Sequence, residues 1–294
     1  MTKLLERLRE ARQTMTGREQ RIAMALEEGF PHAGLESATA LSERLGVSAA
    51  TVVRFAAKLG YGGYAQLQRE MRGEVEARLA TPLQRLDQIA PDVMGAMSDG
   101  DVVDRTFEAA LAALTRSFGA LDRPGLARIT LALTHCNGRV LILGEKKARS
   151  VALYLFAQLN LCLPRVSLLA TDAGFEGDNL LDIGQDDLLV AIDVRRYVRR
   201  GLAAAEFAQS RGAGLIVLAD STASPLYGRS QMRLCASTNS AGAFDSYVGL
   251  MLFADIIANA VVAANPAAAR ARLSLGEEAW GKLGVFKSEN SSTS

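Results

Sequence analysis

The chain has 294 residues, of which 49% are hydrophobic and 22% are charged. That length accommodates two domains with separate cores, and the composition excludes a disordered or fibrous chain. Because 33 Lys and Arg face 32 Asp and Glu, the net charge is only +1. Nucleic-acid binding driven by bulk charge is therefore excluded, whereas a local basic surface is not.

The chain carries no signal for a membrane or for metal chemistry. No apolar run reaches the roughly 18 residues of a membrane helix, and the N-terminal stretch lacks a signal-peptide core. Cys136, Cys162 and Cys235 are far apart and lack the spacing of metal ligands. We therefore expect a cytoplasmic protein with free thiols, no membrane partner, no metal and no cofactor.

Two helical segments open the chain, at residues 3–12 and 16–28. The first has leucines on one side and charges on the other. The second begins with Thr16 and Glu19, which have the spacing of a helix-capping box. Both segments are predicted to support the stretch that follows.

Residues 37–60 predict two short helices around a tight turn. Leu41 and Leu45 recur at helical spacing, and Gly46 can adopt the positive φ that ends a helix. Ser48 then caps a second helix, whose apolar side chains follow the pattern of one buried face. The residues of this buried face are Val52, Phe55, Ala56 and Leu59.

The opposite face of the second helix is small, polar and basic, with Ser48, Thr51, Arg54 and Lys58. A helix-turn-helix needs such a face because its second helix enters a major groove about 12 Å wide, where cations and hydroxyls meet phosphates and base edges. The alternative is an ordinary helical hairpin whose polar face only meets water. The pattern alone leaves both alternatives open.

Residue identities favour DNA binding. Residues 41–68, LSERLGVSAATVVRFAAKLGYGGYAQLQ, resemble the DNA-binding domain of the RpiR/MurR family of bacterial transcription regulators, with its Val-Ser-x-x-Thr-Val-x-Arg-Phe core at 47–55. The resemblance implies that residues 1–80 form a helix-turn-helix domain that binds double-stranded operator DNA.

The DNA contacts are expected on the second helix and just after it. We expect Ser48, Thr51 and Arg54 to contact bases or phosphates, and Lys58 to contact the DNA backbone. Tyr61 is a further candidate for a backbone contact, although an aromatic side chain beside glycines is more often part of a core.

Beyond a predicted linker at 81–100, the pattern changes to that of an α/β domain over residues 101–265. Short continuous apolar runs alternate with helical segments, which predicts a doubly wound parallel sheet covered on both faces. The expected strands are 139–143, 165–170, 187–192, 214–218 and a weak fifth at 234–236. The expected helices are 102–117, 125–136, 149–161, 177–181, 201–211 and 246–264. Residues 266–294 are expected to form a C-terminal tail, disordered over 287–294.

This second domain resembles the sugar isomerase (SIS) domain, which RpiR-type regulators carry after their DNA-binding head. The resemblance is carried by LDRPGLARITLALTHCNGRVLILG, RGAGLIVLADSTASPL and FDSYVGLMLFADIIANAV. The predicted fold is thus an all-α helix-turn-helix domain joined to an α/β doubly wound, SIS-type domain. In the family this domain binds a phosphorylated sugar or sugar derivative, and the ligand changes operator affinity.

The two ligand loops depart from the family pattern. Where the family has Gly-x-Gly-x-Ser after the first strand, this chain has Gly-Glu-Lys-Lys-Ala at 144–148; where it has Ser-x-Ser-Gly-x-Thr, the chain has Asp-Val-Arg-Arg-Tyr-Val at 193–198. Cations have replaced hydroxyls and bare amides. Only the segment 220–226 keeps the family form.

These cations predict an anion site at the carboxyl ends of the strands, where ligands bind in such sheets. The effector would be a sugar phosphate, a sugar acid or another carboxylate. The candidate effector-binding residues are Lys146, Lys147, Arg149, Ser150, Arg195, Arg196, Arg199, Ser221 and Ser224. Alternatively, the charges form a solvated rim or a subunit contact, and each serine forms a cap or turn bond.

An enzyme built on the same fold is the rival class. A sugar-phosphate isomerase needs a base near neutral pKa and a grip on the substrate phosphate. His135 precedes the first strand and so lies at the wrong end of the sheet, which leaves Glu145 and Glu176 as possible bases. We therefore expect no catalysis. A DNA-binding protein with a vestigial effector site remains a third alternative.

A single small head buries little DNA surface, so pairing of heads is expected. The SIS domains would then form a homodimer or homotetramer that places two heads on a two-fold operator.

Overall fold

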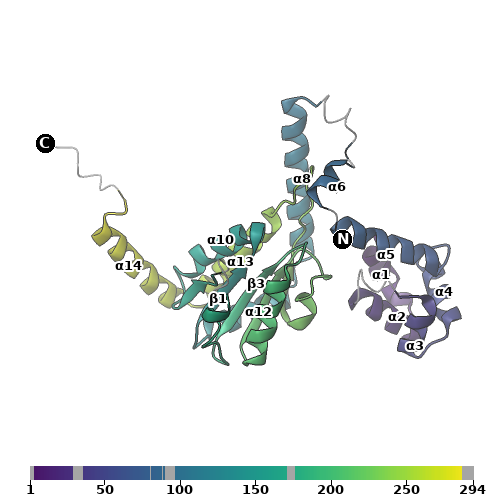
Figure 1. Ribbon diagram of the computed structural model, residues 1–294, viewed down its shortest axis with the longest axis horizontal. Coiled ribbons are helices and arrows are strands. Elements are labelled where there is room, and N and C mark those ends of the chain that lie inside the picture. Colours follow the sequence, from purple (N-terminus) through teal and green to yellow (C-terminus); the bar gives the residue numbers. More distant parts are fainter. Residues whose placement is uncertain are drawn as a thin grey trace.

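The computed structural model describes residues 3–28, 36–79, 81–87, 89, 97–170 and 176–286. A helical N-terminal head precedes an α/β domain, and helical segments connect the two (Figure 1). The two regions have separate hydrophobic cores. The buried core of the head lies within residues 4–71, and the core of the α/β domain, on both faces of its sheet, lies within residues 129–269.

The head is built from five α-helices and a short 3-10 helix in its described residues. Their bounds are α1 Lys3–Ala11, η1 Arg12–Thr14, α2 Gly17–Glu28, α3 Ala38–Leu45, α4 Ala49–Lys58 and α5 Tyr64–Leu79. Leu8, Ile22, Leu41 and Phe55 are almost completely buried among them. The apolar face predicted for the second helix of the hairpin therefore lies in this core.

The turn between α3 and α4 forms as its sequence predicts. Ser37 caps α3 by accepting a hydrogen bond from the amide of Ala40 at 3.1 Å. Gly46 ends that helix in the left-handed conformation with φ of +63°, which costs glycine little because it has no Cβ. Ser48 then caps α4 and accepts from the amide of Thr51 at 3.1 Å.

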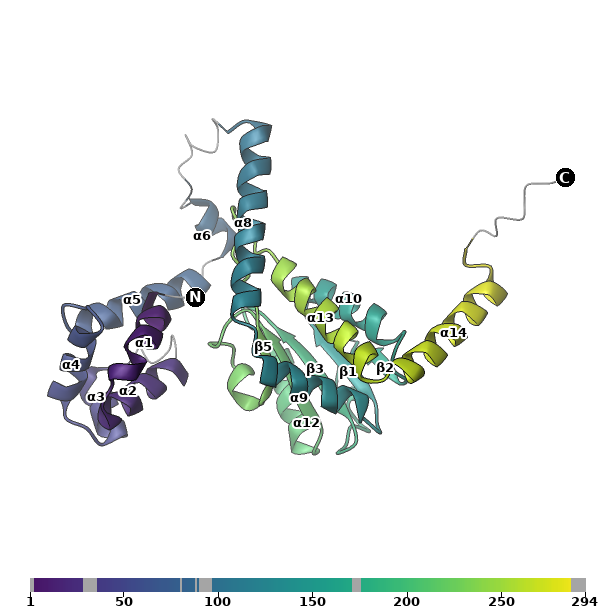
Figure 2. The same ribbon diagram turned by 180° about the vertical axis from the view of Figure 1, so that it is seen from behind.

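In the part of the chain that the structure describes, three helices lead from the head to the sheet. They are α6 Pro82–Asp87, α8 Asp99–Gly119 and α9 Arg123–Thr134. Helix α8 starts at a capping box formed by Ser98 and Asp101 and runs toward the edge of the sheet that carries the last strand (Figure 2). Helix α6 lies within the predicted linker.

The sheet has five parallel strands in the order β2-β1-β3-β4-β5. Their bounds are β1 Val140–Gly144, β2 Val166–Leu168, β3 Leu188–Asp193, β4 Gly214–Ala219 and β5 Met232–Cys235. The predicted doubly wound parallel sheet is therefore confirmed. The fifth strand begins two residues before its expected start.

Helices cover both faces of the sheet, as Figures 1 and 2 show. One face is covered by α9, α10 Arg149–Leu159 and α13 Val248–Ala264, and the other by α12 Arg199–Ser210, while residues 177–179 of the short helix α11 Glu176–Asn179 are exposed. Val140 and Ile142 of β1 pack with α9, α10 and α13, while Leu141 and Leu143 pack with α12 on the opposite face. This alternation along one strand explains why the strands read as continuous apolar runs.

The strand order creates a topological switch point between β1 and β3. The chain leaves β1 toward β2 on one side and later returns to place β3 on the other side. The segments that follow β1 and β3 therefore begin side by side at the carboxyl ends of these strands, where doubly wound sheets bind their ligands.

A long helix occupies part of the region expected to be a tail. Helix α14, Pro266–Leu283, starts with Asn265 accepting a hydrogen bond from the amide of Ala268 at 3.2 Å and ends at Gly284 with φ of +63°. This helix was not predicted from the sequence, although Asn-Pro and Gly are ordinary start and stop signals, and the assignment of residues 266–294 to a C-terminal tail stays a prediction. The predicted disorder over 287–294 lies outside the described residues.

Membrane-spanning potential was tested over the described ranges. No single helix there has both the length and the hydropathy to cross a bilayer, and only α13 and α14 together reach them, across a bend of 109°.

Candidate functional site

Helix α4 presents the polar face that the sequence predicts. Ser48 and Arg54 are exposed and Thr51 is half-buried. The hydroxyls of Ser48 and Thr51 are 2.8 Å apart, so the two side chains hold each other at the start of the helix. Within the described residues, Arg54 makes no hydrogen bond or ion pair. The start of α4 is thus free of protein partners beyond its own cap.

The other two DNA-contact candidates already have structural roles. Lys58 donates to the carbonyl of Thr14 at 2.7 Å and to a carboxylate oxygen of Glu19 at 2.9 Å. Tyr61 is only 4% exposed, and its hydroxyl donates to Glu70 at 3.0 Å. The enclosed ring of Tyr61 fits the core-packing alternative that the sequence left open, and its contact with the DNA backbone stays a prediction.

A pocket of about 410 Å³ opens at the switch point of the sheet. Its wall comes from the segments after β1 and β3, from α6 and from the segment before α13. The lining residues are Pro82, Arg85, Glu145, Lys146, Lys147, Val194, Arg195, Arg196, Tyr197, Val198, Ala243, Phe244, Asp245 and Tyr247. Five of these side chains are cationic and two are carboxylates.

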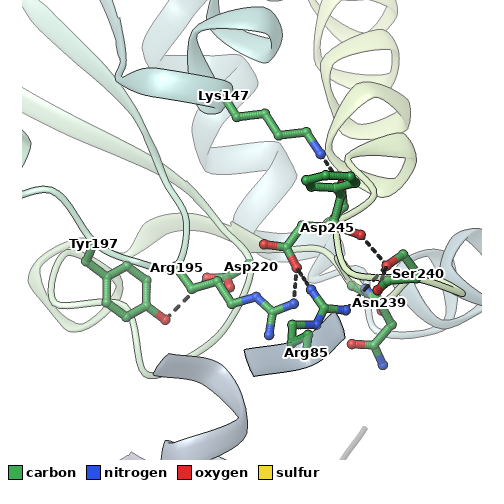
Figure 3. Close-up of polar contacts among 11 residues, drawn as sticks. Arg85, Lys147, Arg195, Tyr197, Asp220, Asn239, Ser240 and Asp245 are labelled. Carbon is green, nitrogen blue, oxygen red and sulfur yellow. Dashed lines mark hydrogen bonds and ion pairs between the residues drawn. The ribbon is translucent and has the colours of Figure 1, made fainter. Parts of the chain in front are cut away.

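Asp245 is the centre of the polar contacts in this pocket (Figure 3). Its Oδ1 accepts from Nη1 of Arg85 at 2.8 Å and also from Nη2 of Arg195. Lys147 donates to the main-chain carbonyl of Asp245, and its Nζ lies 4.7 Å from the ring centroid of Tyr247. Three cations from three separate segments therefore meet at one residue.

These cations are held at an electrostatic cost. Burial lowers the pKa of Arg195, and the neighbouring charge of Arg85 lowers it further. Burial and Arg85 lower the pKa of Lys147 in the same way, and burial lowers that of Arg85 itself. Since loss of hydration and like charges both disfavour the charged form, an added anion in this pocket would relieve both effects.

The pocket gathers four of the six cations predicted for the site. Lys146, Lys147, Arg195 and Arg196 line it. Arg149 and Arg199 do not line the pocket, since Arg149 begins α10 and Arg199 begins α12, and their contact with an effector stays a prediction. The positions of these cations in the sequence do not show which side chains at the start of a helix face the pocket.

The three predicted serines make local bonds instead. Ser150 donates to the carbonyl of Lys147 at 2.8 Å. Ser221 is buried and accepts from the amide of Ala223 at 3.0 Å, and the buried Ser224 donates to Asp193. Such turn and cap bonds are the alternative role that short hydroxyl side chains commonly adopt, and a contact of these serines with an effector stays a prediction.

Asp193, at the end of β3, is a titratable group that the sequence did not single out. Burial raises its pKa to about 6, while the hydrogen bond from Ser224 acts in the opposite direction. The cavity beside it, which Glu145 also lines, holds only about 20 Å³, which is room for about one water molecule. A sugar ring therefore has no room next to this carboxyl.

Sequence reasoning missed Arg85, Asp245 and Tyr247. Arg85 and Asp245 are 160 residues apart. Arg85 lies in the predicted linker, and Asp245 and Tyr247 lie at the start of a stretch that resembles the SIS domain but was assigned no ligand contact. Among the described residues no group of three or more His, Cys, Asp or Glu side chains is placed to hold a metal ion.

The fold and the site define a two-domain protein that joins a helix-turn-helix head to a doubly wound α/β domain with a cationic pocket. Residues 2–78 match the helix-turn-helix domain of the rpiR family, and residues 132–260 match the SIS domain. The chain therefore belongs to the RpiR family of transcription regulators, as its sequence resemblance implies.

Solved structures share this fold. The sugar isomerase domain of an RpiR transcription factor from Sphaerobacter thermophilus aligns with a TM-score of 0.57 and 23% identity over 60% of this chain and 98% of that one. The Vibrio vulnificus NanR protein, complexed with ManNAc-6P, aligns at 0.56 and 23% over 95% and 98%. A protein from Escherichia coli CFT073 aligns at 0.50 and 18% over 62% and 100%.

Proposed function

We propose that this regulator binds operator DNA through α4 and senses an anionic metabolite in the pocket of its SIS domain, which changes operator binding. The effector is a sugar phosphate, a sugar acid or another carboxylate. The observation that carries the proposal is the convergence of Arg85, Lys147 and Arg195 in a pocket of about 410 Å³ at the switch point of the sheet.

The chemistry of the pocket supports an anionic ligand. Guanidinium groups bind carboxylates and phosphates through two parallel hydrogen bonds, and the volume is in the range of small-molecule sites. The complex of the structurally similar NanR protein with ManNAc-6P supports a sugar phosphate as one candidate. The cationic loops that replace the hydroxyl-rich family loops widen the choice to sugar acids and carboxylates.

A thermal-shift screen against sugar phosphates, sugar acids and di- or tricarboxylates tests the sensor. A ligand at 100 times its dissociation constant should add about 2.7 kcal/mol of stability. The shift should disappear in Arg195→Gln and Lys146→Ala. It should persist in Arg128→Gln, a matched control whose guanidinium pairs with Asp122 away from the pocket. A broad panel without a hit would favour a vestigial site.

Operator binding should depend on the exposed face of α4. Arg54→Ala should cost about 1 to 3 kcal/mol of operator affinity if its guanidinium contacts a base edge. Fluorescence anisotropy with operator DNA at several salt concentrations measures this loss, with Arg128→Gln again as control. An unchanged affinity in Arg54→Ala would remove α4 from the DNA interface.

We further propose that the SIS domains assemble into a homodimer or homotetramer. A paired arrangement supports two heads on a two-fold operator, since one helix-turn-helix contacts only a half-site. Sedimentation at operator-binding concentrations should show a dimer or tetramer, and a monomer that binds operator with full affinity would contradict the pairing.

We propose no catalytic activity for the SIS domain. Asp193, with its pKa raised to about 6, is the group that best fits the base of an isomerase. Its carboxyl faces a cavity of about 20 Å³ and accepts from Ser224, so a sugar ring has no room next to it. Turnover of a sugar phosphate by the purified protein, lost in Asp193→Asn, would favour the isomerase alternative.

A further inference from the structure

Helix α6 is a short helix that one side chain anchors to the SIS domain. It spans six residues, Pro82–Asp87, and none of them is buried. Leu83 and Leu86 are 65% and 40% exposed, so apolar packing does little to fix the helix. Arg85 supplies the anchor, because it donates to Asp245 at 2.8 Å and to Ser240 at 3.4 Å.

The local sequence makes α6 a defined unit despite its length. The amide of Thr81 donates to the side chain of Gln84 at 2.8 Å, and the amide of Gln84 donates to the hydroxyl of Thr81 at 3.1 Å. This reciprocal cap, with Pro82 at the first helical position, starts the helix. A helix this short is marginal by itself, so its position depends on the contact that Arg85 makes.

Helix α6 also follows the head closely in the chain. Only two residues separate Leu79, the end of α5, from Pro82, the start of α6. The three steps from Leu79 to Pro82 span at most about 11 Å, so only a small movement of α6 can occur without also moving α5. The contact of Arg85 with Asp245 therefore connects the pocket to α6, and a short stretch of chain connects α6 to the head.

In the pocket, one carboxylate oxygen serves two guanidinium groups. Arg85 and Arg195 both donate to Oδ1 of Asp245. Asp245 thus supplies an anion at the place where the anionic group of a ligand would have to bind to reach both cations. A phosphate or carboxylate ligand and Asp245 cannot both satisfy this pair in the same way.

We propose that α6 completes the effector site: Arg85 binds the anionic group of the effector, which takes the place of Asp245 between Arg85 and Arg195. This inference rests on the proposed function and adds a mechanism by which binding at the effector site is regulated. A phosphate or carboxylate group offers separate oxygens to the two guanidinium groups, which now share one. The exchange therefore repositions α6 relative to β3, and α5 of the head follows.

The first test compares anion binding in matched variants of the full chain. Inorganic phosphate and succinate are titrated by calorimetry. The two probes show whether the pocket prefers a phosphate or a carboxylate group. Asp245→Asn keeps the side-chain shape but removes the competing charge, so it should bind the preferred anion about tenfold more tightly than the wild type. Arg85→Gln should bind it at least tenfold more weakly. Asp122→Asn, which removes the partner of Arg128 elsewhere, should change neither.

The second test follows α6 itself by amide hydrogen exchange over residues 83–87. Without ligand, Asp245→Asn should exchange these amides faster than the wild type, because Arg85 has lost its anionic partner. Saturating phosphate or succinate should restore their protection in Asp245→Asn but not in the double variant Arg85→Gln/Asp245→Asn. This rescue requires an anion that bridges α6 to the SIS domain.

The possible outcomes distinguish a failure of the proposed role of α6 from a failure of the proposed sensor function. Anion binding that Arg195→Gln weakens but Arg85→Gln leaves unchanged overturns the role of α6 and retains the sensor. Asp245→Asn binding no more tightly than the wild type, or showing no rescue of α6, overturns the exchange. Absence of binding by phosphate, succinate and the whole metabolite panel to wild type and variants overturns the sensor and the inference together.

Discussion

Arg54 on α4 of the head is exposed and has no partner among the described residues, whereas Arg195 in the SIS pocket is 11% exposed and is paired with Asp245. An exposed cation keeps its hydration until it meets a polyanion, and salt screens it strongly. A buried, paired cation has already lost much of its hydration, so a small anion gains more by binding there. The exposed cation on α4 thus suits a large polyanion, whereas the buried cation in the pocket suits a small anion.

The two regions also differ in what holds them together, and the largest predicted effect tests their independence. Phe55 is 1% exposed in the head, and Phe253 is fully buried in the SIS domain. Phe55→Ala should cost about 3 to 5 kcal/mol in the head while anion binding by the SIS domain survives. Phe253→Ala is the matched control and should do the reverse.

Calorimetry with and without the effector measures this independence. The effector should raise only the transition of the SIS domain in the wild type and in Phe55→Ala. A single transition that Phe55→Ala and Phe253→Ala shift equally would show that the two cores unfold as one unit.

The next effect is a pH dependence specific to the SIS domain. Asp193 has a folded pKa of about 6 against an ordinary value of 3.8, so the native state binds more protons than the unfolded state between these values. Stability should therefore fall as pH rises from about 4 to 6 and stay level above. Asp193→Asn removes this titration and should gain about 2 to 3 kcal/mol relative to the wild type between pH 4 and pH 7.

Urea unfolding at each pH measures the titration of Asp193. Ser224→Ala removes a hydrogen bond that favours the ionised carboxyl, so it should move the fall in stability to higher pH. Parallel pH profiles in wild type and Asp193→Asn would contradict the raised pKa.

The smallest effect distinguishes Lys58 from Arg54 on the same helix. The hydrogen bond from Lys58 is the largest cause of the lowered pKa of Glu19, and both groups are partly exposed. Lys58→Ala should cost at most about 1 kcal/mol of stability and less operator affinity than Arg54→Ala. The contribution of the pair should be present above pH 4.5 and be lost as pH falls through the lowered pKa of Glu19.

A double-mutant cycle of Lys58→Ala and Glu19→Gln isolates that pair. Additive losses of stability would show that the ion pair contributes nothing. A loss of operator affinity in Lys58→Ala that exceeds the loss in Arg54→Ala would return Lys58 to the DNA interface.

Local chemistry made most of the fold predictable. Ser37, Gly46 and Ser48 fix the helix-turn-helix through caps and one left-handed residue, and such signals act over three or four residues. The strands were predictable because parallel strands buried on both faces are continuous apolar runs. The same kind of signal, Asn265 before Pro266, marks the start of α14.

The pocket was only partly predictable because its geometry depends on distant segments. Strand order brings the loops after β1 and β3 together, and the sequence pattern anticipated the cations of both. The contact of Arg85 with Asp245 joins the linker to a loop 160 residues away, and no periodicity encodes it. The burial of Tyr61 and Ser224 likewise depends on packing that a motif does not specify.

The double contact of Asp245 has a consequence for the dose at which such a regulator responds. A tethered carboxylate competes at a fixed effective concentration that neither dilution nor growth conditions alter. If it occupies the two guanidinium groups about 90% of the time, the apparent dissociation constant of the effector is about tenfold above the intrinsic one, which is the factor that Asp245→Asn should remove. On the proposed mechanism, phosphate and carboxylates present below this raised dissociation constant would produce no response, and the length and charge of residue 245 would tune that threshold.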